Sequence, residues 1–486
     1  MTAENDGGTL ALLRSTRFAL ALIGLLGFLV EYALRIDISV ALVCMVNHTA
    51  VQSAADAGRV RNDTDCATMD TVEKEDGPFV WEKEKQGLIL GAFFWGYIVT
   101  QIPAGMLAEK IGGKPVILVA MTIAGVGTLL SPLAASWGYG ALIALRVVIG
   151  LAEGVMFPAF HCIWSRWAPP LERSLLVGVS YSGAQLGNVL TLAASGIICN
   201  TLGWQYIFYL LGGLCMLWCL LWLVFATSAP EQHRRISTAE LEHINRSLRG
   251  QTATAHDIAN TPWRAMLTSW PVWAIIVMHF GVNFGNYMPM TELPTWMNEV
   301  LGFNEAANGL WSALPYILFF LIQSSSGFVA DFVRRKRWLS TGNVRKLAMC
   351  IAMGGQALFF VAAGYANCHT QLLGVLFITL AQGISGVQSG GFLVNHVDIA
   401  PKYAGTLFGI SNMAATIPGI VAPYVASAVT VHGTEAEWRL VFDGAAGILL
   451  VCTVFYCATA SGELQSWAAT NNDHMHDDDD HTHRDR

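Results

Sequence analysis

The sequence predicts an all-α membrane protein with twelve transmembrane helices in two six-helix bundles. Of its 486 residues, 53% are hydrophobic and only 13% are charged, with a mean hydropathy of +0.46, which leaves too little charge for the surface of a soluble protein. The apolar residues form continuous runs of about 20, the length that crosses a bilayer as a helix. A pattern of small residues, one acid and then bases occurs twice, at 105–114 and 327–336. Such a repeat is typical of a duplicated helix bundle.

The apolar runs predict six spans in each half of the chain. In the first half the predicted spans are 18–45, 86–107, 115–135, 141–164, 174–199 and 206–227. In the second half they are 271–292, 310–329, 346–365, 371–394, 405–428 and 439–460. The first run is too long for a signal peptide and ends without a small-residue cleavage site, so we expect it to remain as a helix.

The charges of the loops predict the orientation. Short loops with basic residues such as Lys110 and Arg166 fall on one side, which the positive-inside rule assigns to the cytosol. Arg14 and Arg17 place the N-terminus (1–17) on the same side, and an even number of spans returns the tail (461–486) to it. The linker between the halves (228–270, partly helical) is expected in the cytosol as well. The loop 47–85 is then expected to be luminal or extracellular.

The sequence of the outer loop predicts covalent modification. It carries two N-glycosylation sequons, and Asn62 is the better acceptor because Asn47 lies at the membrane edge. Cys66 and Cys368 both fall in predicted outer loops, and a disulfide between them stays open. Cysteines inside apolar runs, such as Cys44, are expected to be small buried hydrophobic residues.

Composition also argues against some partners. The net charge of -7 gives no reason to expect nucleic acid. The tail is rich in His and Asp, but nothing fixes its geometry, so we expect it to be solvated and predict no metal site there.

Several stretches resemble one known family. They are 32–47, 91–103, 153–161, 167–173, 395–401 and 415–419. Together with the repeated loop they resemble the organic-anion branch of the major facilitator superfamily. This branch holds sialin, the vesicular glutamate transporters and the sodium–phosphate cotransporters, and the chain is most similar to the sialin type. The resemblance covers nearly everything except the termini and the outer loop.

The resemblance implies a major facilitator fold that works by alternating access as a monomer in membrane lipid, without a cofactor. The expected cargo is sialic acid or another acidic sugar, moved with protons. A sodium-dependent phosphate cotransporter and a vesicular anion transporter are the alternatives. The vesicular glutamate transporters carry a histidine where this chain has Leu90 and an arginine where it has Val282, so glutamate is less expected. The membrane is expected to be lysosomal, vesicular or plasma membrane.

Two readings from other classes stay open at this point. An intramembrane enzyme would use His396 and Asp398, but no nucleophile or metal cluster accompanies them, so no catalytic residue is predicted. A receptor that kept the fold and lost transport is the second reading, and the intact repeat argues against it.

Arg35, inside the first span, is the leading candidate for binding an anion. A charged side chain at the bilayer centre costs about 2.5–3.5 kcal/mol on insertion scales, so its presence needs a reason. A guanidinium stays charged and binds a carboxylate through two hydrogen bonds. The alternative is that Arg35 only pairs with a neighbouring acid.

Four buried residues are candidates for proton coupling. Glu153 follows Arg146 by seven residues and shares its helix face, so it could switch its charge or form a static ion pair with that arginine. Glu31 lies one turn before Arg35 and departs from the apolar residue of the family. His161 could relay a proton or be a hydrogen-bonded structural histidine.

Polar residues at helical spacing predict the rest of the substrate site. The fifth span holds Tyr181, Gln185 and Asn188, and the seventh holds a stripe that includes Asn283 and Tyr287. Lipid cannot satisfy these groups, so we expect them to line a cavity, or else to join helices.

The repeated loop predicts a conformational gate. Its acids, Glu109 and Asp331, are expected to tie helix ends together in one access state, together with the bases Lys114 and Arg334.

Overall fold

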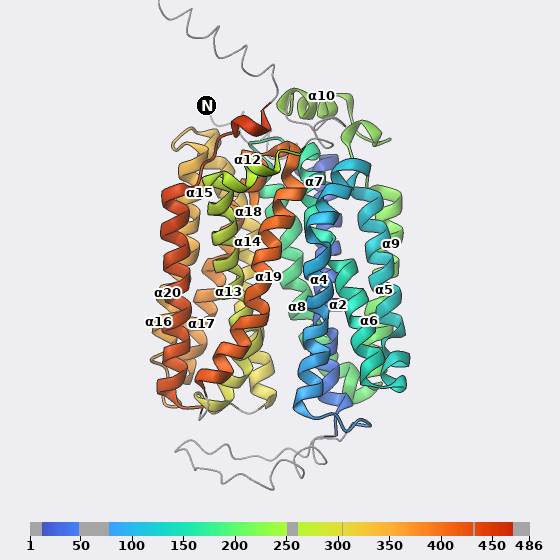
Figure 1. Ribbon diagram of the computed structural model, residues 1–486, viewed down its shortest axis with the longest axis vertical. Helices are drawn as coiled ribbons and strands as arrows, with labels where there is room; N and C mark the ends of the chain where they lie inside the picture. The colour runs from blue at the N-terminus through green and yellow to red at the C-terminus, as the bar shows by residue number, and fades with distance from the viewer. Residues whose placement is uncertain (1–11, 48–76, 250–260, 304, 431–432, 470–486) are drawn as a thin grey trace, which may run out of the picture.

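The computed structural model describes residues 12–47, 77–249, 261–303, 305–430 and 433–469. Within these residues the chain is helical, and the one isolated β-bridge joins Val46 to Phe79. Long helices stand side by side in two groups, the first half of the chain in blue to green and the second in yellow to red (Figure 1). Each of the twelve predicted segments falls in helix.

The first bundle contains six membrane-length segments. They are α2 (Thr16–Met45), α4 (Lys83–Ile111), α5 (Gly113–Trp137), α6 with α7 (Tyr139–Glu153 and Met156–Trp167), α8 (Arg173–Thr201) and α9 (Gln205–Phe225). The predicted fourth span is thus interrupted at Gly154 and Val155. Gly154 lies against α4, where an added Cβ would come within 2.6 Å of the Tyr97 carbonyl oxygen.

The second bundle repeats this plan. It contains α13 (Trp270–Glu299), α14 (Glu305–Arg335), α15, η3 and α16 (Thr341–Met349, Cys350–Gly354, Gly355–Ala363), α17, η4 and α18 (Gln371–Ser385, Gly386–Gly390, Phe392–Ile399), α19 (Ala404–Val429) and α20 (Glu435–Thr459). In the described part of the chain, eleven segments are long and apolar enough to span a membrane. The twelfth, α13, has the same length but is interrupted by polar residues such as His279 and Asn283. The chain is therefore a multi-pass membrane protein.

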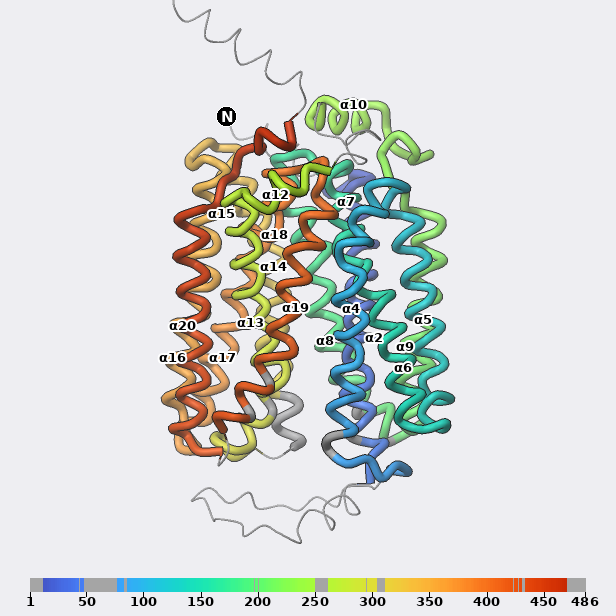
Figure 2. Tube along the Cα trace, viewed as in Figure 1, coloured from blue at the N-terminus to red at the C-terminus, as the bar shows by residue number. Residues whose placement is uncertain are grey.

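The linker lies at the end of the bundles where the chain enters α2 and leaves α20 (Figure 2). Its helix α10 (Thr238–Ser247) agrees with the predicted helical stretch, and a short helix α12 (Trp263–Thr268) leads into α13. We call this the linker end of the molecule. The N-terminus of α2 is fixed there, because the side chain of Ser15 accepts a hydrogen bond from the Phe18 amide.

Backbone contact between the bundles depends on the glycines of the repeated pattern. Gly105 on α4 packs against the backbone of Gly405, where α19 begins, and Gly327 on α14 packs against the backbone of Ser174, where α8 begins. A side chain at either glycine would collide with the other bundle. The repeat thus places a close helix crossing at two equivalent positions.

One prediction about cysteines is wrong. Cys44 is bonded to Cys199, which ties the end of α2 to the end of α8, and so it is not a simple hydrophobic residue. Cys162, Cys215 and Cys452 are free and buried, as expected. Cys66, the sequon at Asn62 and the histidines of the tail lie outside the described residues, so their roles stay predictions. Asn47 is described, and its backbone amide donates a hydrogen bond to the Phe79 carbonyl at 2.8 Å.

Candidate functional site

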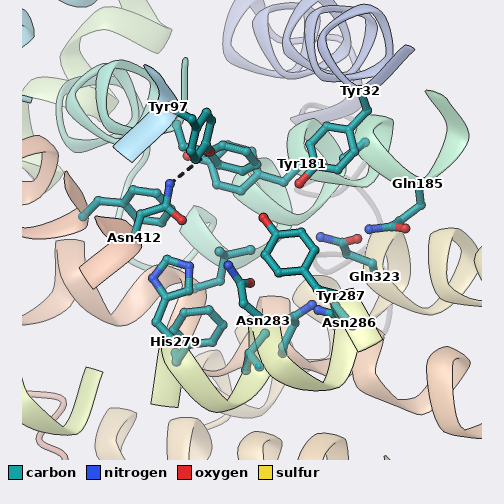
Figure 3. Close-up of a pocket in the computed structure, with 17 residues that line it drawn as sticks. Tyr32, Tyr97, Tyr181, Gln185, His279, Asn283, Asn286, Tyr287, Gln323 and Asn412 are labelled. Carbon is teal, nitrogen blue, oxygen red and sulfur yellow. Dashed lines mark hydrogen bonds between the residues drawn. The ribbon is translucent and has the colours of Figure 1, made fainter. Parts of the chain in front are cut away.

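A cavity of about 70 Å³ lies between the two bundles. Its wall is made largely of hydroxyl, amide and imidazole groups from both halves of the chain, and Figure 3 shows most of these side chains pointing toward one another across it. The polar lining residues are Tyr32, Tyr97, Tyr181, Gln185, His279, Asn283, Asn286, Tyr287, Gln323, Gln388 and Asn412. Among the described residues that line it, His279 is the one base and there is no carboxylate. Such a wall suits a ligand with many hydrogen-bonding groups.

The structure brings four of the predicted substrate residues into this pocket and leaves two out. Tyr181, Gln185, Asn283 and Tyr287 line it. Asn188 is buried at 3% exposure elsewhere on α8. Three further lining residues were not predicted: Gln323, Gln388 and Asn412. An amide inside an apolar run is the signal that could have found them. Asn412 joins the bundles, since its Nδ2 donates to Tyr97 Oη at 3.1 Å and to Gln101 Oε1 at 2.8 Å.

Arg35 lies behind the pocket wall. Its guanidinium carbon is 4.5 Å from the ring centre of Tyr32 and 4.6 Å from that of Tyr97, and both tyrosines line the pocket. The third ring against it belongs to Phe93, at 5.0 Å. Aromatic faces stabilise a buried cation without neutralising it. Two tyrosines therefore separate this cation from the cavity.

Two acids contact Arg35, but together they do not satisfy all the N–H groups of its guanidinium. Its Nη2 donates to Glu31 Oε1 at 2.9 Å, and its Nε lies 3.6 Å from Glu153 Oε2. Among the described residues, Nε and Nη1 of Arg35 have no hydrogen-bond partner, and neither carboxylate oxygen of Glu153 has one. Arg35 is only 6% exposed and both acids are fully buried. A buried charged group left in this state is unfavourable unless something else binds it.

Arg146 pairs with an acid other than Glu153, the partner in one of the two alternatives left open. Its Nη1 lies 3.2 Å from Asp37 Oδ1, and Nη2 donates to the Arg35 carbonyl at 3.0 Å. The static ion pair between Arg146 and Glu153 is therefore not formed. Arg146 therefore joins α6 to the backbone of α2, and the arginine nearest to Glu153 in the cluster is Arg35.

These five side chains form one acid–arginine cluster inside the first bundle. It contains three carboxylates, on Glu31, Asp37 and Glu153, and two guanidiniums, on Arg35 and Arg146. With every group ionised, one negative charge is in excess. Burial disfavours an unpaired charge, so this excess is unfavourable unless another group compensates it.

At the linker end, each acid of the repeated pattern caps a helix of the opposite bundle. Glu109 accepts from the Thr406 amide at 2.7 Å and from the Thr406 hydroxyl at 2.8 Å, at the start of α19. Asp331 accepts from the Leu175 amide at 2.9 Å, at the start of α8. Carboxylates are stabilising at helix N-termini because unpaired amides point at them.

The predicted bases of the gate behave differently from each other. Arg334 lies 3.3 Å from Asp331 Oδ1 and also donates to the Pro170 carbonyl of the first bundle. Lys114 instead donates to the Leu223 carbonyl within its own bundle, at 2.8 Å. Arg334 thus joins the bundles in this conformation and Lys114 does not.

A second ion network closes the same end. Asp398 lies 2.7 Å from Arg345 Nε and 3.2 Å from Arg173 Nη1, which belongs to the first bundle. Arg345 also donates to the Ser174 hydroxyl at 2.9 Å. Each carboxylate oxygen of Asp398 is paired with an arginine, so its role is structural and not catalytic. In the described part of the chain no group of His, Cys, Asp and Glu could hold a metal ion.

His161 lies between the pocket and the linker end. Its Nδ1 is 2.6 Å from the hydroxyl of Tyr181, and its Nε2 is 3.0 Å from the Leu393 carbonyl of the second bundle. It is therefore hydrogen-bonded on both sides and contacts both bundles, but it does not touch the acid–arginine cluster directly.

Comparison with known proteins agrees with this architecture. The family model of the Major Facilitator Superfamily matches residues 20–423. Sialin from Homo sapiens is 44% identical over 460 residues, which cover 95% of this chain and 92% of sialin. Vesicular glutamate transporter 2 from Homo sapiens is 38% identical over 455 residues, covering 93% of this chain and 75% of that protein.

Solved structures are similar in fold at low sequence identity. The proton:xylose symporter XylE, bound to 6-bromo-6-deoxy-D-glucose, has a TM-score of 0.68 and 15% identity, covering 92% of this chain and 97% of XylE. FucP in the outward conformation has a TM-score of 0.58 and 15% identity, covering 91% and 99%. At this identity the likeness extends to the fold alone.

Proposed function

Because this chain belongs to the major facilitator superfamily, in the branch that includes sialin and the vesicular glutamate transporters, and is a transporter rather than an enzyme, we propose that it carries organic anions with protons. The proposed cargo is an acidic sugar such as sialic acid. The transporter works by alternating access in a lysosomal, vesicular or plasma membrane.

The observation that carries this proposal is the unfinished bonding of Arg35. Two buried N–H groups of its guanidinium have no partner among the described residues, and only tyrosine rings stand between it and the pocket. Rotation of Tyr32 or Tyr97 would let a carboxylate oxygen reach the unpartnered Nη1. The hydroxyl and amide groups of the pocket would then bind the remaining polar groups of the cargo.

The same arrangement supports coupling to protons. A carboxylate on Arg35 competes with Glu31 and Glu153 for the one guanidinium. Each acid that loses this partner becomes an unpaired buried charge and binds a proton more tightly. Anion binding and proton binding therefore favour each other, and this reciprocity is the thermodynamic requirement for symport.

The conformation supports alternating access. In the part of the chain that the structure describes, the hydrogen bonds between the bundles lie at the linker end or at the level of the pocket, as those of Glu109, Asp331 and Asn412 do. The pocket is thus closed toward the linker end. Cargo would enter from the other side and leave after these bonds break.

Uptake into proteoliposomes tests the proposal. Purified protein is given an inward proton gradient and, in parallel, sialic acid, glucuronate, glutamate or phosphate. We expect gradient-driven accumulation of the acidic sugars, and no change when external sodium is replaced by choline. Accumulation of phosphate that requires sodium would instead establish the sodium-driven phosphate cotransporter.

Arg35→Ala is the decisive variant in this assay. It removes the guanidinium that lies directly behind the pocket wall, so we expect uptake to fall to the level of empty liposomes. Lys336→Gln, which changes an exposed base at the linker end, is the matched control and should retain uptake. Full activity of Arg35→Ala would refute the assigned role.

A further inference from the structure

A row of polar side chains leads from the pocket toward the linker end, inside the second bundle. His279 of α13 lines the pocket, and its Nδ1 lies 3.0 Å from the hydroxyl oxygen of Ser411 on α19. The same oxygen lies 2.8 Å from Nε2 of His396 on α18. All three residues are at most 4% exposed. One hydroxyl thus joins two imidazoles that are 117 residues apart in sequence.

The surroundings of the row are almost entirely aromatic. The ring of Phe408 lies 5.1 Å from that of His279 and 4.9 Å from that of His396. Two further titratable groups face the row, both from the first bundle: His161 of α7, whose ring is 5.3 Å from that of His396, and Tyr181 of α8, bonded to His161. The described residues supply no carboxylate partner for these three histidines.

A structural role alone does not explain this row. Nδ1 of His396 is buried and has no hydrogen-bond partner among the described residues. A buried histidine that only holds helices together normally has both ring nitrogens bonded. A proton route needs a chain of hydrogen bonds that opens to the pocket at one end. At the other end it needs a nitrogen without a hydrogen-bond partner, as here.

We propose that His279, Ser411 and His396 form the route by which the transported proton passes between the pocket and the linker end. This inference rests on the proton coupling proposed above. It differs from it in assigning the exit of the proton to the second bundle, whereas the acids that bind the proton lie in the first.

The imidazoles of His279 and His396 are neutral before and after the transfer, so protons and charge balance. A proton binds Nε2 of His279, and the proton on its Nδ1 passes to the oxygen of Ser411. The hydroxyl proton of Ser411 moves to Nε2 of His396, and the proton on Nδ1 of His396 leaves. The Ser411 hydroxyl also donates to the Phe408 carbonyl, at 3.0 Å, so it must rotate from that carbonyl toward His396 to conduct.

The contact between the bundles would gate this exit. His161 holds the Leu393 carbonyl, on the same helix as His396, while the linker end is closed. When the bundles part, His161 moves away with α7 and water can reach Nδ1 of His396. The proton then leaves only in the state that also releases the cargo.

Two variants test the route with two assays. Ser411→Ala removes the hydroxyl, and His396→Gln keeps a donor toward Ser411 but cannot pass a proton. The probe is whichever of sialic acid, glucuronate and glutamate the wild type accumulates. Exchange at equal pH needs no net proton movement, whereas uptake under a pH gradient, followed with an internal pH dye, does. We expect gradient-driven uptake and proton influx to fall about tenfold or more in both variants, and exchange to persist.

Ser411→Thr is the matched control, because it keeps the hydroxyl and should restore proton influx. The route is overturned if Ser411→Ala and His396→Gln keep wild-type proton influx, or if they lose exchange and influx in parallel, which would mark a structural role. If the wild type itself moves no protons with its cargo, the proposed coupling fails at that step and the route fails with it.

Discussion

The two bundles share a fold but bury their charges at different depths. In the first bundle, the acid–arginine cluster around Arg35 lies beside the pocket, and the gate acid Glu109 is held by the hydroxyl and the backbone amide of Thr406. In the second bundle, the pocket wall carries amides and histidine, and the charges of Asp331, Arg345 and Asp398 gather at the linker end.

This difference indicates a division of labour between the bundles. Charge beside the pocket can respond to an anion or a proton, because its pairing is incomplete. Charge at the linker end is paired across the bundle interface, so it responds to the separation of the bundles. We therefore expect variants in the first cluster to change coupling and variants in the second to change stability and the balance of access states.

Glu153→Gln should have the largest effect on proton-driven uptake among the acids of the cluster, and it tests the first half of the comparison. Glutamine cannot release a proton, so we expect uptake driven by a pH gradient to fall by about 10²-fold, the typical size of an acid–base contribution. Exchange of labelled for unlabelled anion at equal pH should survive. Unchanged pH dependence of uptake would reject Glu153 as the proton carrier.

Glu31→Gln is the matched variant on the other side of Arg35. It weakens the nearer competitor of the cargo, so anion binding should tighten by about tenfold, or ~1.4 kcal/mol, at neutral pH. Equilibrium binding of labelled anion to the purified protein measures this. Weaker binding in Glu31→Gln would show that Glu31 positions Arg35 instead of competing for it.

Asp398→Asn tests the second half of the comparison. The substitution leaves Arg173 and Arg345 without their shared acid, and an uncompensated buried charge costs about 3–5 kcal/mol. We expect a clear fall in the thermal unfolding temperature of the purified protein, with anion affinity changed little. The control is Glu463→Gln, at an exposed position near the tail. An unfolding temperature equal to that of wild type would contradict the paired role of this acid.

The sequence predicted the fold well because the fold depends on continuous apolar runs and on a repeated loop. It also predicted the buried charges, since Arg35 and Glu153 stand out in apolar surroundings. Pairing was not predictable: Arg146 shares a helix face with Glu153 but reaches Asp37 on another helix. Periodicity reports the face of a helix, whereas partners depend on how helices rotate against one another.

Glu109→Gln should have a smaller effect than Asp398→Asn. Glutamine keeps one oxygen for the Thr406 amide but offers no second acceptor to the Thr406 hydroxyl, so we expect a loss of about 1 kcal/mol. This loss would favour the state open at the linker end about fivefold, with the anion site intact. Thr406→Val, which removes only the hydroxyl, should give a similar shift. Cysteine accessibility at the linker end measures it, and an unchanged balance in both variants would contradict the clamp.

The smallest expected effect lies outside both bundles, where the linker meets α2. Glu240 of α10 accepts from the amides of Thr16 and Arg17, at 3.0 and 3.1 Å, and from the Arg17 guanidinium at 2.9 Å. Burial alone would raise the pKa of Glu240, but these hydrogen bonds and the arginine charge bring the pKa below its ordinary value. A lowered pKa means that the contact stabilises the folded state above the ordinary pKa of glutamate, near 4.3, and is lost as pH falls through the lowered value.

Hydrogen exchange in the amides of α10 measures this contact. After correction for intrinsic rates, we expect protection at pH 7 that decreases toward pH 3.5 in the wild type and is already low at pH 7 in Glu240→Gln. Glu242→Gln, an exposed acid in the same helix, is the control and should behave as wild type. Equal protection at both pH values in the wild type would show that the linker is held by its apolar contacts, such as that of buried Ile244, and that charge outside the bundles contributes nothing to their arrangement.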